Sequence, residues 1–382
     1  MKIVIALDSF KGSLTSLEAG NAVNQGVSAV FPDAEVTVFP IADGGEGTVD
    51  ALTDGERGEK VTSEVSGPLG ERVSACYGVL CGGTAVIETA QAAGLTLVPE
   101  DKRDPMETTT CGVGELIRHA LDRGCRRFIL GIGGSATNDG GTGMLAALGY
   151  RFLDVNGDCI PCGCAGLSRL SRIDTSWADE RLSECDFRVA CDVTNPLLGE
   201  NGCSAVFAPQ KGADAESIPL MDGLLTFYAN VVKRDVNLEA DPSFPGAGAA
   251  GGLGFALKYF LGAALERGCP MIMRETGLSE KIRSADLVIT GEGRLDAQSV
   301  MGKVPFSIAD AAKDGGVPVI ALGGCIGEGA EKLSTCGVSA YFPILHAPCT
   351  LEIAMKKEVA TENLRRTAGQ IARTIRFLKE RN

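Results

Sequence analysis

Six short apolar runs constrain the fold of this chain more than any other feature of its sequence. Most are rich in β-branched residues, most end at a glycine or an acid, and helical patterns follow them. The runs are KIVIAL (2–7), EVTVFPI (35–41), RRFILGI (126–132), ADLVITG (285–291), VPVIALG (317–323) and SAYFPIL (339–345). Such runs are typical of parallel strands covered by helices on both faces. We therefore predict an α/β fold with a doubly wound, six-stranded parallel sheet, which would bind ligands beyond the carboxyl ends of its strands.

The segments between these runs follow a different pattern and predict a second domain. Residues 65–90 alternate apolar and polar side chains between glycine turns, as antiparallel strands do. Residues 150–207 are similarly strand-rich, and a helix is expected near residues 218–232. We expect a parallel-sheet, Rossmann-like domain formed by residues 1–60, 98–148 and 255–382, and a smaller inserted α/β domain formed by residues 61–97 and 149–254.

The charge balance and the cysteines exclude several classes of protein. The formal net charge is −13, and no cluster of Lys and Arg offers a surface for nucleic acid. The apolar run at residues 3–7 is too short for a secretory signal, and no run reaches the length of a membrane span, so we expect a cytoplasmic protein with a small-molecule partner. The 14 cysteines are expected to be reduced thiols. Cys159, Cys162 and Cys164 include one zinc-type C-x-x-C spacing, but a second pair is missing, so ordinary thiols are favoured over a zinc site.

The loops after the predicted strands repeat one type of sequence, in which glycine is combined with an acid and in two cases with lysine. They are DSFKGSLTS (8–16), ADGGEGT (42–48), GGSATNDGGTG (133–143) and GEGRLDAQSVMGK (291–303), and two further loops are ACDVTNPLLG (190–199) and PGAGAAGGLG (245–254). Glycine lets backbone N–H groups crowd round an oxyanion, which indicates phosphate binding, although any one of these loops is equally well a simple turn. Acids beside a phosphate require a cation, and magnesium carried with a nucleotide polyphosphate is the economical choice.

A match to the dinucleotide-binding fingerprint supports a competing hypothesis, an NAD-dependent oxidoreductase acting on a 2-hydroxy acid. Gly131, Gly133 and Ala136 fit G-x-G-x-x-A after a predicted strand, and Asp154 follows about twenty residues later. Against this hypothesis, Asp139 near the helix start would repel a pyrophosphate that is bound without metal. A non-catalytic sensor of a small acid is a third alternative, which no DNA-reading motif or basic patch supports. A Walker A loop, protein-kinase triplets and a hydrolase triad motif are absent from the sequence.

In their order and spacing, the six glycine-rich loops resemble those of the bacterial type I glycerate kinase family, the D-glycerate 2-kinases. The resemblance covers essentially the whole chain. It implies ATP-dependent phosphorylation of D-glycerate to 2-phosphoglycerate with magnesium as the metal. It also implies two α/β domains with the active site in the cleft between them. The chain departs from the family pattern at Leu7, where proline is usual, and at Cys111, where tyrosine or arginine is usual.

Direct phosphoryl transfer requires positioned charges and a base for the attacking hydroxyl group. Lys11 and Lys303 are the lysines embedded in strand-end loops, and we predict that they neutralise phosphate or the glycerate carboxylate. Arg294 can clamp a carboxylate with two parallel hydrogen bonds. For each of these cations the alternative is a solvated or ion-paired surface side chain. Asp192 lies in a loop assigned to the second domain, and we predict that this carboxylate is the base.

The remaining acids and the glycine-rich backbone complete the predicted site. The acids considered for base and metal are Asp8, Asp43, Glu46, Asp139, Asp192, Glu292 and Asp296. Of these, Asp43, Glu292 and Asp296 are the predicted magnesium ligands, directly or through water. The alternative for any of them is to cap a helix or fix a turn, and Asp139 is the first candidate for a cap. Substrate or phosphate binding is predicted for Asp8, Ser9, Gly44, Gly45, Gly133, Gly134, Ser135, Asn138, Asp139, Asn195 and Arg294.

Overall fold

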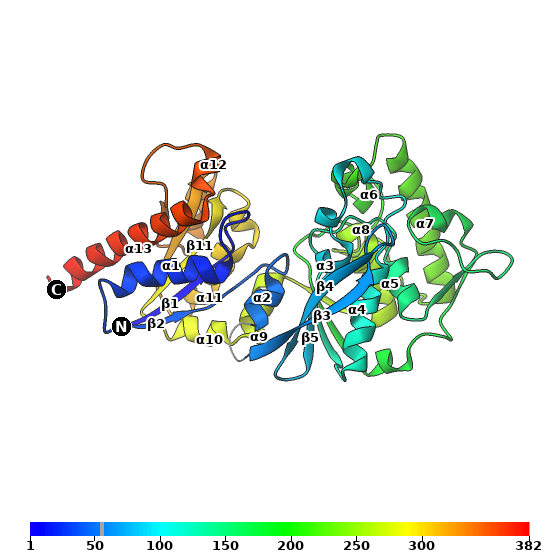
Figure 1. Ribbon diagram of the computed structural model, residues 1–382, viewed down its shortest axis with the longest axis horizontal. Coiled ribbons are helices and arrows are strands. Elements are labelled where there is room, and N and C mark those ends of the chain that lie inside the picture. Colours follow the sequence, from blue (N-terminus) through cyan, green and yellow to red (C-terminus); the bar gives the residue numbers. More distant parts are fainter. Residues whose placement is uncertain (54–56, 382) are drawn as a thin grey trace. The chain divides into compact units, whose positions relative to one another are not determined.

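The computed structural model describes residues 1–53 and 57–381, and the chain divides into two compact units (Figure 1). The first unit contains Met1–Asp43, most of helix α2 (Thr48–Thr53) and the chain from Cys269 onward. The second contains Gly44–Val49 and the chain from strand β3 (Gly58–Ser66) to Gly268. No helix in the described ranges is long and apolar enough to cross a membrane.

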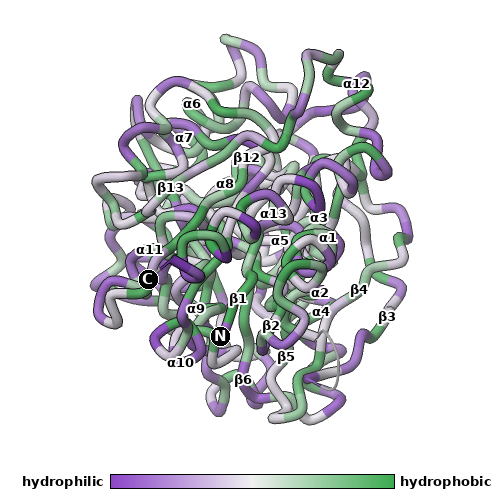
Figure 2. The backbone as a smooth tube through the Cα atoms, turned by 90° about the vertical axis from the view of Figure 1, so that its left-hand side faces the viewer, coloured by the Kyte–Doolittle hydropathy of each residue, from purple (hydrophilic) through white to green (hydrophobic). Residues whose placement is uncertain are grey.

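The first unit is built on a five-stranded parallel sheet with the order β13-β12-β11-β1-β2. Its strands are β1 (Lys2–Leu7), β2 (Glu35–Val38), β11 (Leu287–Leu295), β12 (Val319–Ile326) and β13 (Ala340–Pro343). Figure 2 shows β1 as a largely hydrophobic strand, and it is buried from Ile3 to Leu7. Numbered within this unit, the strand order is 2-1-3-4-5, so the winding reverses between β1 and β11. Ligands of open α/β sheets bind at such a switch point, outside the carboxyl ends of the strands.

Helices cover both faces of this sheet, because right-handed crossovers in opposite directions place their helices on opposite faces. α1 (Ser16–Ser28) connects β1 to β2, and α11 (Val304–Lys313) connects β11 to β12. The long α13 (Lys357–Lys379) packs beside α1 (Figure 1), and a Cβ added at Gly26 would lie 2.2 Å from the carbonyl oxygen of Arg365. The unit's other helical segments are α9 (Gly268–Glu275), α10 (Leu278–Arg283), η7 (Ser299–Met301), η8 (Ala330–Cys336) and α12 (Leu351–Ala354).

The second unit is built on a six-stranded mixed sheet with the order β10-β9-β6-β5-β4-β3. After β3 its strands are β4 (Arg72–Leu80), β5 (Thr84–Glu88), β6 (Arg127–Gly131), β9 (Asp186–Ala190) and β10 (Ala264–Glu266). β3, β4 and β5 pair antiparallel, as the alternating pattern of residues 65–90 predicts, while β5, β6, β9 and β10 pair parallel. The register pairs Gly131 with Ala190, so the loops after β6 and β9 leave the sheet side by side.

The remaining elements of the second unit pack around this sheet. β7 (Arg151–Leu153) and β8 (Arg172–Asp174) form a separate antiparallel pair. The helices are α3 (Ala90–Ala93), α4 (Cys111–Asp122), α5 (Thr142–Ala147), α6 (Cys203–Phe207), α7 (Ser217–Asp235) and α8 (Ala249–Leu261), and 3-10 turns lie at Leu95–Leu97, Glu100–Lys102, Ala165–Arg169, Glu180–Glu184 and Pro209–Lys211. The core includes the stacked rings of Phe128 and Phe187, whose centroids lie 4.7 Å apart on neighbouring strands.

The structure corrects the predicted partition of the chain. The run at residues 126–132 forms a parallel strand as predicted, but β6 pairs with β5 and β9, so the first sheet has five strands rather than six. Residues 98–148 and 255–268 accordingly belong to the second unit. An apolar, β-branched run indicates a strand that is buried on both faces, whereas distant segments decide which strands become its neighbours. β2 also ends earlier than predicted, at Val38.

Candidate functional site

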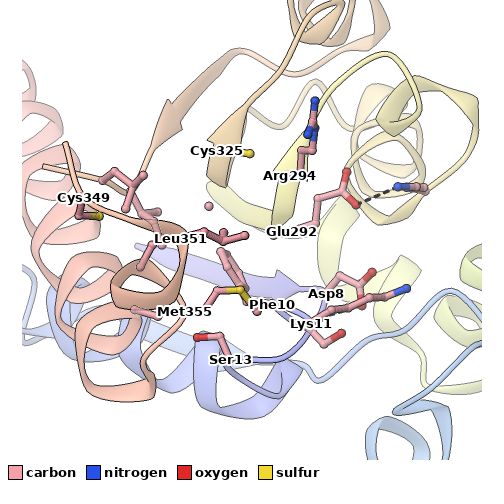
Figure 3. A pocket seen from close by; sticks show the side chains of 18 of the residues that line it. Asp8, Phe10, Lys11, Ser13, Glu292, Arg294, Cys325, Cys349, Leu351 and Met355 are labelled. Atoms are coloured by element: carbon pink, nitrogen blue, oxygen red, sulfur yellow. Dashed lines mark hydrogen bonds and ion pairs between the residues drawn. The ribbon is translucent and has the colours of Figure 1, made fainter. Parts of the chain in front are cut away.

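A pocket of about 540 Å³ lies at the carboxyl ends of the strands of the first unit (Figure 3). Its lining comes from the loop after β1, Asp43 in the segment after β2, the ends of β11 and β12, Lys303 before α11, and the segment after β13. The pocket therefore includes the switch point between β1 and β11. The residues of the predicted site that line it are Asp8, Ser9, Lys11, Asp43, Glu292, Arg294 and Lys303.

Asp8 is a nearly buried carboxyl group at the polar end of this pocket. The residue is 6% exposed, and its Oδ1 accepts a hydrogen bond of 2.7 Å from the backbone N–H of Ser9. Burial, together with the negative charges of Asp43 and Glu292, raises the pKa of Asp8 to about 7, although the hydrogen bond from Ser9 and the charge of Lys11 oppose the rise. A carboxyl group with a pKa near neutral is typical of functional sites.

Glu292 is held between a hydroxyl group and an ammonium group. The fully buried Ser299 donates a hydrogen bond to its Oε1, and Nζ of Lys303 lies 3.8 Å from its Oε2 (dashed in Figure 3). Burial raises the pKa of Glu292, although Ser299 and Lys303 oppose the rise. Sequence reasoning missed Ser299. This residue lies in the loop at residues 291–303, after the predicted metal ligands Glu292 and Asp296 and before the predicted phosphate-binding Lys303.

Three cations line the same pocket. Lys11 lies in the turn after β1, and Lys303 is the N-cap residue of α11. Nε of Arg294 lies 2.9 Å from Oδ2 of Asp296, so this guanidinium group already has one carboxylate partner. Both signs of charge therefore line one pocket, which suits an anion that binds together with a metal cation.

Two of the three predicted magnesium ligands, Asp43 and Glu292, line the pocket. In the part of the chain that the structure describes, no group of three or more His, Cys, Asp or Glu side chains is arranged to hold a metal ion. Asp43 and Glu292 line the pocket, and magnesium commonly binds through one or two carboxylates together with waters and substrate phosphates. Asp296 does not line it: its Oδ1 accepts the N–H of Gln298 at 2.9 Å and its Oδ2 pairs with Arg294. The geometry gives Asp296 the alternative role, fixing a turn.

In the second unit, the loop after β6 is exposed only at its start. Gly133 and Gly134 are exposed, whereas residues 135–140 are buried. The buried part runs beside the segment after β5, where the N–H of Ala136 donates to the carbonyl oxygen of Ala93 at 2.8 Å. Gly133 and Gly134 are therefore the residues of this loop that are open to a ligand, and Glu46, on a different loop of the same unit, is also exposed.

Asp139 organises this loop and does not face solvent. Its Oδ2 accepts hydrogen bonds from the N–H and the hydroxyl of Thr110 at 2.9 and 2.8 Å, and its Oδ1 accepts the N–H of Gly141 at 3.0 Å. Complete burial raises the pKa of Asp139, although these hydrogen bonds oppose the rise. The prediction that Asp139 binds a ligand is therefore corrected in favour of its alternative, an acid that fixes the turn before α5.

Asn138 is likewise part of the core rather than a donor to a phosphate. Its residue is fully buried, and Nδ2 donates to Oγ of Ser204 at 3.0 Å and lies 3.5 Å from Sδ of Met221. A side chain enclosed in this way has no path to a ligand on the exposed part of the loop. The prediction of Asn138 as a phosphate-binding residue is therefore corrected.

Close packing explains two of the glycine-rich segments. At Gly251, where φ is +68°, a Cβ would lie 2.1 Å from the carbonyl oxygen of Thr137. At Gly44, where φ is +91°, a Cβ would lie 2.2 Å from the Cβ of Ala190. Only glycine avoids both the left-handed strain and these overlaps. The carbonyl oxygen of Gly45 accepts hydrogen bonds from the first residue of α2, so this backbone also shapes the fold.

A buried lysine that sequence reasoning missed anchors the β6 loop. Lys211 is 2% exposed, and its Nζ donates to the carbonyl oxygen of Thr137 at 2.6 Å and to Oγ of Ser135 at 3.1 Å. Ser135 is therefore occupied by a protein partner. Burial lowers the pKa of Lys211 to about 8. Its partners lie 74 and 76 residues away in the chain, so no local pattern marks this lysine.

Asp192 and Asn195 lie in the loop after β9, beside the β6 loop. Asp192 is exposed, and its Oδ1 accepts the N–H of Gly268 at 3.3 Å. Asn195 donates from Nδ2 to the carbonyl oxygen of Asn201 at 2.8 Å, and its own carbonyl oxygen accepts the N–H of Gly248 at 3.0 Å. Asn195 thus shapes its loop, while Asp192 presents a carboxylate at the surface.

Asp154, the acid that the nicotinamide hypothesis requires, has partners in its own turn. Its Oδ1 accepts the N–H groups of Asn156 and Asp158 at 2.8 and 3.1 Å, and its Oδ2 pairs with Arg169 at 2.8 Å. The hydrogen bond from Arg169 lowers the pKa of Asp154. A carboxylate held in this way is not available to a ribose hydroxyl, which removes the main structural argument for an oxidoreductase.

Comparisons with known proteins identify the family. The glycerate kinase family model matches residues 3–376. The glycerate 2-kinase of Escherichia coli (strain K12) is 47% identical over 98% of both chains, and the glycerate kinase of Bacillus subtilis (strain 168) is 48% identical over 99% of both. The crystal structure of the putative glycerate kinase 2 from Salmonella typhimurium LT2 matches with a TM-score of 0.90 and 48% identity, covering 100% of this chain and 99% of that one. The resemblance of the loop sequences is thereby confirmed, and the chain belongs to the glycerate kinase family.

Proposed function

We propose that this enzyme transfers the γ-phosphoryl group of ATP to D-glycerate and that 2-phosphoglycerate is the product. Membership of the glycerate kinase family over the whole chain supports the reaction class, and the name of the Escherichia coli relative, glycerate 2-kinase, supports the position of transfer. The structural observation that carries the proposal is the switch-point pocket, in which Asp8 and Glu292 lie with Lys11 and Lys303. Phosphoryl transfer asks the protein mainly for such positioned charges.

The three cations of the pocket supply the positive charge that a polyphosphate or a carboxylate needs. Lys11 and Lys303 would neutralise phosphate oxygens, since each carries an ammonium group and lines the pocket at the end of the sheet. Arg294 would bind the glycerate carboxylate through two parallel hydrogen bonds, exchanging its partner Asp296 for the substrate. In the second unit, the exposed backbone of Gly133 and Gly134 would donate hydrogen bonds to phosphate oxygens.

Asp43 and Glu292 are the residues that would hold Mg²⁺, directly or through water. The donor set fits, because two carboxylates in a pocket that also holds lysines leave the remaining ligands to water and phosphate oxygens. When bound, the ion would offset negative charge on the transferred phosphoryl group. Ser299 keeps the Glu292 carboxylate oriented by its hydrogen bond to Oε1.

Asp192 is the proposed base, which would accept the proton of the attacking hydroxyl group of glycerate. Its carboxylate is exposed, it lies at the carboxyl end of a parallel strand, and one oxygen is oriented by the N–H of Gly268. A neutral amide at this position would keep that hydrogen bond but would lose the capacity to take a proton.

A steady-state assay of ATP consumption with D-glycerate tests this proposal. We expect the wild type to consume ATP only when D-glycerate is present, and we expect Asp192→Asn to lower kcat by about 100-fold or more with a smaller change in KM. Glu200→Gln is the matched control, because it removes one exposed negative charge from the same loop. ATP that stays intact with the wild type would refute the reaction, whereas a fully active Asp192→Asn variant would refute only the assignment of the base.

A further inference from the structure

The switch-point pocket has two chemically different ends. Asp8, Lys11 and Glu292 lie at one end, and Met355, Leu351 and Cys349 lie at the other, with Phe10 between them (Figure 3). Leu351 is 73% exposed and Met355 is 37% exposed, although both are large apolar side chains. They belong to α12 and the residue after it, so a short helix presents apolar surface to the pocket instead of burying it.

The size of the pocket favours a nucleotide over glycerate as the ligand that fills it. A volume of about 540 Å³ is typical of sites that enclose a ligand of many atoms. A three-carbon acid carries a carboxylate and hydroxyl groups, and it offers almost no apolar surface to Leu351, Met355 and Phe10. A nucleoside triphosphate has both parts that the pocket requires, a flat heterocycle at one end and a chain of anionic phosphates at the other.

We propose that this pocket is the nucleotide site, with the purine base packed against Phe10, Leu351 and Met355 and the phosphates directed toward Lys11 and Lys303. The inference rests on the proposed kinase function and adds the location and orientation of the nucleotide. Aromatic bases pack well on thioether and aliphatic side chains, and burial of such surface supplies affinity without any demand for hydrogen bonds. The acids Asp8 and Glu292 then lie at the phosphate end, where a divalent ion accompanies the nucleotide.

Gly12 brings the two ends of this site together. Its φ of +75° closes the turn that carries Lys11, and a Cβ at this position would lie only 2.7 Å from Cε of Met355. Because the glycine has no side chain, Met355 rests directly on the phosphate-end turn. The apolar surface for the base and the turn that carries the lysine are therefore parts of one contiguous wall.

Two variants of α12 test the proposal. Leu351 lines the pocket, whereas Ile353, which lies on the same helix and is 44% exposed, does not. We expect Leu351→Asp to raise the KM for ATP about tenfold or more while the KM for D-glycerate stays within about twofold, because a carboxylate replaces apolar contact with the base. Ile353→Asp introduces the same charge into the same exposed helix and is expected to leave both KM values unchanged.

Calorimetric titration of the two variants with magnesium and either ATP or inorganic tripolyphosphate separates the base from the phosphates. We expect Leu351→Asp to weaken ATP binding about tenfold and tripolyphosphate binding hardly at all. An unchanged affinity for ATP, or a change that falls on the KM for D-glycerate instead, would overturn the proposal while leaving the kinase function intact. If the wild type bound ATP in the pocket but transferred no phosphoryl group, the proposed function would fail and the nucleotide site would stand.

Discussion

Nζ of Lys211 lies 2.6 Å from the carbonyl oxygen of Thr137, and this hydrogen bond ties a fully enclosed ammonium group to the loop after β6. The same ammonium group donates to Ser135, so a single buried cation satisfies two polar groups of the loop. The exposed Gly133 and Gly134 lie immediately before these anchored residues. The stability of this loop, and through it the placement of the exposed glycines, depends on Lys211.

Replacing Lys211 with methionine removes both hydrogen bonds while nearly conserving the volume. We expect Lys211→Met to lower the free energy of unfolding by about 1–3 kcal/mol, because the carbonyl oxygen of Thr137 and the hydroxyl of Ser135 remain buried without their donor. Urea unfolding measures the loss. Lys233→Met, at an exposed position of α7, is the control and should change the stability by less than about 0.5 kcal/mol. Equal stability of the two variants would contradict the anchoring role.

The raised pKa of Asp8 predicts a pH-dependent stability. The folded-state pKa is about 7 and the unfolded value is about 4, so the folded state binds the extra proton between these values and stability falls as pH rises from about 4 to 7. Asp8→Asn removes the carboxyl group, and with it the cost of burying a negative charge at high pH, and keeps an acceptor for the Ser9 N–H. The stability of the variant relative to the wild type should therefore increase between pH 4 and 7, by at most about 4 kcal/mol, and stay constant above pH 8. Unfolding curves of both proteins across this range measure the difference, and a constant difference would contradict the assigned pKa.

Lys303 is the N-cap residue of α11, and its ammonium group lies 3.8 Å from Oε2 of Glu292. The side chain of Lys303 also lines the pocket. We expect Lys303→Met to lower kcat/KM for ATP by about 100-fold, because a preorganised positive charge is lost where phosphate charge develops. Lys313→Met removes a cation from the far end of the same helix, where it pairs with Asp310, and should leave kcat/KM within about twofold. Equal losses of kcat/KM for the two variants in a steady-state assay would contradict a specific role of Lys303 and would show that the activity depends only on the net charge of the helix.

Ala250 adopts a left-handed conformation, with φ at +52° and ψ at +41°, beside the glycines that pack on the β6 loop. A non-glycine residue pays about 1 kcal/mol for this conformation. Ala250→Gly is therefore expected to stabilise the protein by about 0.5–1 kcal/mol, whereas Ala249→Gly, at a buried neighbour with negative φ, should destabilise it. Thermal unfolding of the two variants distinguishes these signs, and a loss of stability in both would contradict the strain argument.

The sequence predicts the strands better than it predicts their partners. Each of the six apolar runs forms a strand, and the alternating segment at residues 65–90 forms antiparallel strands. β6 lies in the other sheet because it pairs with β5 and β9, and no local sequence pattern specifies these partners. Periodicity reports the burial of a strand, and burial is the same in either sheet.

For the site, the sequence is a reliable guide to the loops that form the pocket. It is a less reliable guide to the side chains that face the pocket. Asp8, Lys11 and Glu292 line it as the strand-end position suggests. Asp139 carries the same type of side chain in the same type of loop, yet the N–H groups around it turn its carboxylate into a structural acceptor. The role of an acid depends on donors brought in from distant segments, which is why Lys211 also escaped prediction.

Phosphorus NMR of a reaction that contains the wild-type enzyme, magnesium, ATP and D-glycerate tests the central claim most directly. We expect ATP to be converted to ADP and one new phosphomonoester signal to appear, split by a single proton because the phosphate is attached at C2. A signal split by two protons would contradict phosphorylation at C2 and indicate the 3-phosphate, and the absence of any new phosphomonoester would contradict the assignment of a glycerate kinase.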